Sequence, residues 1–156
     1  VSGSMNTPDL HSLLKLLQQN GVNYILVGGQ AIRLLGFIRA TEDVDLVVPL
    51  DEKNGERLIR SLGFLESSKE LQSWWFSREA NADEIQNIRV ADELVIDILF
   101  AANGETYESL QPFIRHVEIE GVSITTLDVE GLLKTKTGYR EKDAIDRDFL
   151  LKIRKV

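Results

Sequence analysis

Residues 94–100, with the sequence LVIDILF, place one acidic side chain in the middle of an otherwise apolar stretch. A short run of β-branched and large apolar residues predicts a buried strand, and it is far too short to cross a membrane. An aspartate is almost never buried without a partner, because desolvating its charge is costly. Asp97 therefore needs a cation from the protein or a metal ion. Arg33, Arg39 and Arg89 are the candidate protein cations.

The first third of the chain alternates helical patterns with short strand patterns. Leucines at positions 10, 13, 14 and 17 follow helical spacing, so we expect a helix over residues 7–20. Thr7 is its expected cap, with Pro8 in the first turn. The next expected elements are strands at 24–27 and 44–48 and helices at 30–35 and 52–62, the last capped by Asp51.

Residues 66–93 carry the weakest pattern. The sequence WWF at residues 74–76 fits a strand or a helix, and residues 86–90 fit a strand. The C-terminal part predicts a hairpin at 116–120 and 122–126 around Gly121, a helix at about 128–137 capped by Asp128, and a helix at 143–153. We therefore expect one mixed α/β domain over residues 5–156, with its core at about 22–127 and C-terminal helices at about 128–156.

Composition narrows the possible functions. The chain has 156 residues without cysteine, which excludes disulfides, thiol catalysis and thiolate zinc sites. A net charge of −7 argues against a broad contact with duplex DNA. Residues 1–4 resemble a tag remnant before Met5, and no signal-peptide pattern follows. We therefore expect a cytoplasmic protein with no membrane partner.

Asp43 and Asp45 are two residues apart on a predicted strand, so their side chains point to the same face. Unpaired carboxylates side by side repel each other, and Mg²⁺, which prefers oxygen ligands, would relieve this. The alternative is one turn cap and one exposed strand-end residue. If Asp97 lies on a neighbouring strand, the three carboxylates could hold two Mg²⁺ ions ~3.5–4 Å apart, as in-line phosphoryl transfer requires.

Gly28-Gly29 lies where a predicted strand turns into a predicted helix. Backbone N–H groups at such a turn can face an anion, and glycine lets a phosphate approach closely. An ordinary tight turn is the alternative. Neither the Gly-x-Gly-x-x-Gly nor the Walker pattern is present, so the sequence does not support Rossmann or P-loop binding.

Gly28-Gly29, then 13 residues, then Asp43-x-Asp45 and a distant Asp97, is similar to the DNA polymerase β-type nucleotidyltransferase superfamily. The stretch over residues 27–46 looks like the branch that contains the AbiEii-type abortive-infection toxins. The segment over residues 136–146, KTGYREKDAID, resembles the helical Lys…Lys/Arg-Asp-x-x-Asp motif of that branch. The resemblance covers residues 22–151 in order, except for residues 66–93.

The resemblance implies the nucleotidyltransferase fold and a role for each matched residue. Asp43 and Asp45 would bind both metals, and Asp97 would bind one while helping to activate the acceptor. Asp143 and Asp146 would lie on the acceptor side, although a solvated helix face is the alternative. The residues implied to contact the nucleotide are Gly28, Gly29, Gln30, Arg39, Thr41, Lys136 and Lys142.

We expect a Mg²⁺-dependent transfer of a nucleoside monophosphate from an NTP, such as ATP, to a hydroxyl of tRNA, a protein or a small molecule. The AbiEii-like branch implies the toxin of a toxin–antitoxin or phage-defence system, with a cognate antitoxin as partner. One alternative is an antibiotic nucleotidyltransferase of the lincosamide or aminoglycoside type, with Trp74, Trp75 and Glu79 near the acceptor. Another is a non-catalytic nucleotide- or partner-binding module. The two tryptophans themselves are expected in the core.

Overall fold

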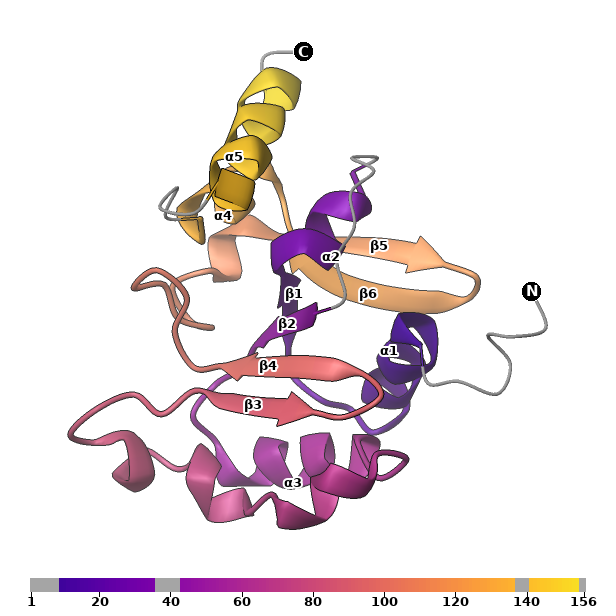
Figure 1. Ribbon diagram of the computed structural model, residues 1–156, viewed down its shortest axis with the longest axis vertical. Helices are drawn as coiled ribbons and strands as arrows, with labels where there is room; N and C mark the ends of the chain where they lie inside the picture. The colour runs from indigo at the N-terminus through magenta and orange to yellow at the C-terminus, as the bar shows by residue number, and fades with distance from the viewer. Residues whose placement is uncertain (1–8, 36–42, 137–140, 155–156) are drawn as a thin grey trace.

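A mixed β-sheet lies at the centre of the computed structural model, which describes residues 9–35, 43–136 and 141–154 (Figure 1). The described residues form a four-stranded sheet in the order β1-β2-β4-β3. Strand β1 (Ile25–Val27) is antiparallel to β2 (Asp43–Val47), and β2 is parallel to β4 (Val95–Leu99). Strand β3 (Ile88–Ala91) completes the sheet antiparallel to β4.

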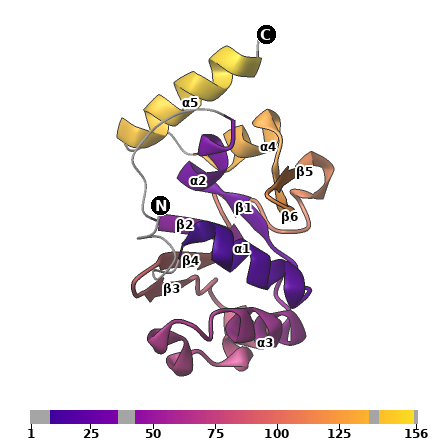
Figure 2. The same ribbon diagram turned by 90° about the vertical axis from the view of Figure 1, so that its right-hand side faces the viewer.

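Helices flank the sheet at both ends of the molecule (Figure 2). Helix α3 (Glu52–Ser61) lies at one end, and α5 (Glu141–Arg154) lies at the other. The remaining helices are α1 (Leu10–Gln19), α2 (Gly28–Arg33) and α4 (Val129–Lys134), and the hairpin is made of β5 (Ile114–Ile119) and β6 (Val122–Leu127). No described helix combines the length and the apolar content needed to cross a membrane. The expected mixed α/β fold is confirmed.

Aspartate side chains cap three of the helices. Asp51 accepts a hydrogen bond from the Asn54 N–H at 3.0 Å, and Asp128 accepts one from the Gly131 N–H at 2.8 Å, as their sequence positions predict. The expected Thr7 cap is wrong. Helix α1 begins at Leu10 because the Asp9 carboxylate accepts the Ser12 N–H at 2.8 Å; Thr7 itself lies outside the described residues.

The two faces of the central strands have opposite character. Val44, Leu46, Ile96 and Ile98 are fully buried and form part of the core. Side chains alternate along a strand, so the intervening residues of β2 and β4 point to the opposite face. Those residues include all three aspartates of the predicted metal site. The packing of one face therefore determines where the carboxylates of the other face lie.

Residues 66–81 contain short 3₁₀ helices rather than a strand or an α-helix. They are η2 (Glu66–Glu70), η3 (Ser73–Phe76) and η4 (Glu79–Asn81). Within η3, Phe76 is fully buried against the edge of Phe100, with ring centroids 5.5 Å apart. Trp74 and Trp75 are 53% and 38% exposed, so their expected place in the core is wrong. Phe76 takes the buried position, and its neighbours in a tight turn point elsewhere.

Phe76 should anchor this whole region. We expect Phe76→Ala to lower the free energy of unfolding by about 3–5 kcal/mol, because it leaves a cavity between Gly55 and Phe100. Urea denaturation followed by circular dichroism measures the loss. Phe64→Ala, at an exposed aromatic residue, is the control and should cost less than about 1 kcal/mol. Equal effects of the two substitutions would contradict this role.

Candidate active site

Asp45 and Asp97 lie directly opposite each other on the parallel strands β2 and β4. Neighbouring strands are about 4.8 Å apart, and paired residues present their side chains to the same face. The carboxyl groups of Asp45 and Asp97 are close enough to share a hydrogen bond. Asp43 lies two residues earlier on the same strand. The structure thus brings the three predicted carboxylates into one cluster.

The environment of Asp45 favours its neutral form. Burial and then the charge of Asp97 raise the pKa of Asp45 from 3.8 to about 6, while the cation of Lys136 acts in the opposite direction. Asp43 adds a smaller raising effect. The raised pKa therefore reflects burial first and the neighbouring carboxylate second.

Arg89 is the protein cation that pairs with Asp97. Its Nη1 donates to both carboxylate oxygens of Asp97 at 3.0 Å, and its Nη2 lies 3.5 Å from Oδ2 of Asp43. Arg89 and Asp97 are register partners on β3 and β4, which explains the geometry. Of the other two candidates, Arg33 bonds Gln30 instead, and Arg39 lies outside the described residues.

Arg89 affects how well the cluster could hold a metal ion. Among the described residues, no three acidic or histidine side chains converge on one point as they stand. Both oxygens of Asp97 face Arg89, and Asp43 leans toward the same guanidinium. The donor set itself suits Mg²⁺, since it consists of carboxylate oxygens on adjacent strands with excess negative charge. A metal could use all three only after Arg89 moves away.

Gly28 is the residue of the glycine pair that touches the cluster. Its φ of 72° lies in the left-handed region, and a Cβ there would overlap Oδ2 of Asp45. The close approach of α2 to β2 therefore requires glycine at this position. Gly29 is buried in α2 and does not line the cavity at the cluster.

A cavity of about 260 Å³ opens beside the carboxylates. Its walls come from β1, α2, β2, β4, α5 and the segments that follow β4 and α4. The lining residues are Val27, Gly28, Asp45, Asp97, Leu99, Ala102, Thr135, Lys136 and Asp143. Val27, Leu99, Ala102 and Thr135 were not predicted as site residues, because neither charge nor a chemical role distinguishes them. The volume suits the phosphate part of a nucleotide better than a whole one.

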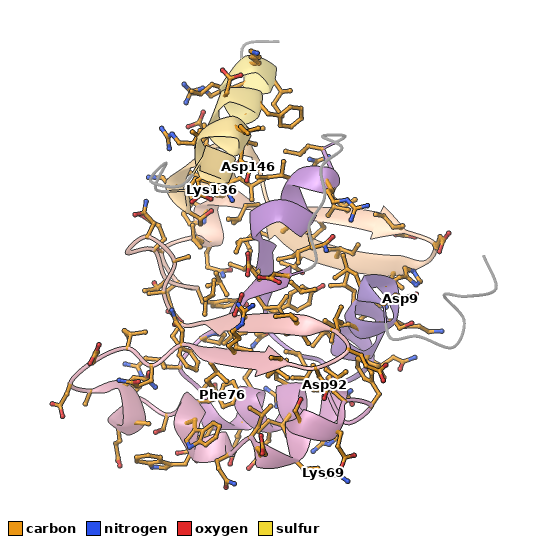
Figure 3. The ribbon with its side chains drawn as sticks, viewed as in Figure 1. Asp9, Lys69, Phe76, Asp92, Lys136 and Asp146 are labelled. Atoms are coloured by element: carbon orange, nitrogen blue, oxygen red, sulfur yellow. The ribbon has the colours of Figure 1, made fainter. Side chains whose placement is uncertain are left out.

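Lys136 enters this cavity wall from a buried ion cluster (Figure 3). Its Nζ lies 3.3 Å from Oδ1 of Asp143 and 2.8 Å from Oδ2 of Asp146. The three residues are 8%, 3% and 0% exposed, so the solvated-face alternative for this part of α5 is wrong. Asp143 and Asp146 are three residues apart, which places them on one face of α5. That face is buried, as is Leu150 one turn later.

The remaining predicted nucleotide contacts lie elsewhere. Gln30 lines a separate cavity with Arg33 and His11, away from the carboxylates. Arg39 and Thr41 lie outside the described residues. Lys142 belongs to α5, but its side chain is not among those described.

Comparison with known proteins bears on the fold. No protein-family model and no curated protein matches the chain. A solved structure from Thermotoga maritima, named a "putative nucleotidyltransferase", matches with a TM-score of 0.55 and 18% identity, over 92% of this chain and 91% of that one. The chain therefore has the nucleotidyltransferase fold. The AbiEii-like branch stays a prediction.

The raised pKa of Asp45 predicts a pH-dependent stability. Its folded-state value of about 6 exceeds the unfolded 3.8, so this group favours folding below about pH 4, and the contribution is lost as pH rises through about 6. In EDTA, this contribution to the free energy of unfolding should fall between about pH 4 and 7. We expect Asp45→Asn to remove up to about 2 kcal/mol of this fall. Urea denaturation at each pH measures it. Asp83→Asn, at an exposed acid, is the control and should leave the fall unchanged.

Proposed function

We propose that this protein is a Mg²⁺-dependent nucleotidyltransferase, which moves a nucleoside monophosphate from an NTP to an acceptor hydroxyl. The observation that carries the proposal is the pairing of Asp45 with Asp97 on parallel strands, facing a cavity that Gly28 and Lys136 also line. The nucleotidyltransferase fold and the name of the Thermotoga maritima neighbour support it.

Asp43, Asp45 and Asp97 would hold the metal, which would stabilise the charge on the transferred phosphoryl group and the leaving pyrophosphate. The excess of carboxylates in the cluster is the feature of this chain that fits a divalent cation. Arg89 holds two of these carboxylates in its absence. We expect Arg89 to release them when the metal binds.

The reaction itself is a substitution at the α-phosphorus. The acceptor oxygen forms a bond to that phosphorus, the bond to the β-phosphate breaks, and pyrophosphate leaves with its electron pair. Asp97, once free of Arg89, takes the acceptor proton. Lys136 presents a cation to the phosphates, and Asp143 and Asp146 fix its position.

The biological role follows from the resemblance to AbiEii-type toxins. It extends the proposal to a toxin of a toxin–antitoxin or phage-defence system, which would modify tRNA or a protein and bind a cognate antitoxin. An antibiotic-type nucleotidyltransferase is the second candidate, and the exposed Trp74 and Trp75 favour it because they could bind a small acceptor. The intact carboxylate cluster favours both over a non-catalytic binding module.

Label transfer tests the proposed reaction. We expect transfer from an α-labelled NTP, with Mg²⁺, to one of four acceptor pools: tRNA, lysate protein, a lincosamide or an aminoglycoside. Asp45→Asn and Asp97→Asn should lower the rate by at least about 100-fold, because each removes a metal ligand. Asp83→Asn should retain it. Transfer by both Asp45→Asn and Asp97→Asn at the unmodified rate would overturn the roles of Asp45 and Asp97. If the protein neither transfers label nor binds Mg-NTP, the proposal that it is an enzyme is overturned.

Arg89 gives a separate test of the metal site. Because its guanidinium competes for Asp97 and Asp43, Arg89→Gln should bind Mn²⁺ several-fold more tightly than the unmodified protein. Electron paramagnetic resonance of free Mn²⁺ measures the affinity without any reaction. Arg78→Gln is the matched control at an exposed arginine. Unchanged or weaker binding by Arg89→Gln would show that the arginine does not compete with the metal.

A further inference from the structure

A second cavity, of about 380 Å³, lies at the start of β3. Its size falls in the range of small-molecule sites, which is about 300–1,000 Å³. The lining residues are Trp74, Trp75, Ala80, Gln86, Asn87 and Ile88. None of them lines the carboxylate cavity, so the two cavities are distinct.

The two indole side chains are exposed on a segment that is firmly held. Phe76, next to Trp75, is fully buried. The amide of Asn81, itself only 6% exposed, donates to the carbonyls of Trp75 at 3.1 Å and Ser77 at 2.9 Å. Its Oδ1 accepts the N–H of Gln86 at 2.7 Å. One buried amide thus ties the tryptophan wall of the cavity to the glutamine wall. Adjacent exposed tryptophans on a braced segment are typical of a binding site.

The cavity also contains an available polar group. The side-chain amide of Gln86 is exposed and makes no hydrogen bond to the described residues, so it can donate to a ligand and accept from it. A flat apolar wall with a single adaptable amide suits a ring that carries hydroxyl or amino groups.

Asn87 links this cavity to the carboxylate cavity. Its Oδ1 accepts the N–H of Phe100 at 2.9 Å, and its Nδ2 donates to the carbonyl of Ala101 at 3.4 Å. Leu99 and Ala102, which flank that pair, line the carboxylate cavity. The two cavities therefore lie on either side of the chain that leaves β4.

No charged side chain of a described residue lines the cavity itself, but charges near it favour a neutral or cationic ring. The loop that carries Ala80 and Gln86 also carries Glu79, Asp83 and Glu84, all exposed, against one arginine, Arg78. The whole chain has a net charge of −7. Such a surface repels a phosphate backbone and attracts a cation, which an indole face also attracts.

We propose that the Trp74–Trp75 cavity binds a neutral or cationic small organic molecule with a ring.

Intrinsic fluorescence reports on this cavity alone, because Trp74 and Trp75 are the only tryptophans in the chain. We expect benzyltrimethylammonium to change the emission saturably in EDTA, without nucleotide. Benzyl alcohol should bind more weakly. Trp75→Ala and Trp74→Ala should each weaken benzyltrimethylammonium binding at least about 10-fold, with the remaining tryptophan as reporter. Phe64→Ala, at an exposed aromatic outside the cavity, should bind normally.

Absence of a saturable change would overturn the binding site. So would binding by Trp74→Ala and Trp75→Ala that is as tight as binding by the unmodified protein. If a hexa-adenylate RNA binds more tightly than benzyltrimethylammonium, the cavity is a nucleic-acid site and the small-molecule proposal is overturned. Asp45→Asn should keep benzyltrimethylammonium binding, so loss of catalysis and loss of this site are separable.

Discussion

The register between β2 and β4 forces two like charges together. Val44 and Leu46 pair with Ile96 and Ile98, and these four side chains are fully buried. With a side-chain period of two, the same register places Asp45 opposite Asp97 on the other face. A slip of β2 by one residue would turn Asp45 toward the core and Leu46 away from it. Hydrophobic packing on one face therefore holds an electrostatically unfavourable pair on the other.

The rest of the site responds to that pair from two directions. Arg89 approaches from β3 and contacts Asp97 and Asp43, whereas Lys136 approaches from beyond α4. Lys136 lowers the pKa of Asp45, but by less than burial and the charge of Asp97 raise it, and its ammonium also contacts Asp143 and Asp146. Among the described residues around the cavity, carboxylates outnumber cations. Burial and then the charge of Asp97 raise the pKa of Asp45 to about 6, and a divalent cation would stabilise the ionised carboxylates.

The sequence was most informative where a single local pattern decides the structure. The apolar run around Asp97 predicted β4, and Asp51 and Asp128 predicted their helix caps. Choices between equivalent neighbours were not predictable. Asp9 rather than Thr7 caps α1, because both are good capping residues and only the backbone selects one.

Partner selection needed the tertiary structure for the same reason. Three arginines were candidates for Asp97, and the β3–β4 register chose Arg89. Spacing alone placed Asp143 and Asp146 on one helix face, but only the packing of α5 shows that this face is buried around Lys136. The WWF segment showed no helical or strand periodicity of its apolar residues, because a single short 3₁₀ turn is too short to have one. The exposure of its tryptophans follows from Phe76 alone taking the core position.

The end of β4 connects these features into one functional layout. Strand β4 supplies Asp97 and Leu99 to the carboxylate cavity, and Phe100 immediately after it packs on Phe76, which braces the tryptophan segment. Asn87 bonds the same stretch of chain from the side of the second cavity. A ligand in the carboxylate cavity thus lies against this stretch of chain, and a ligand in the second cavity lies against the asparagine that bonds it. The two cavities therefore share one wall, and a shift of residues 99–102 would alter both of them.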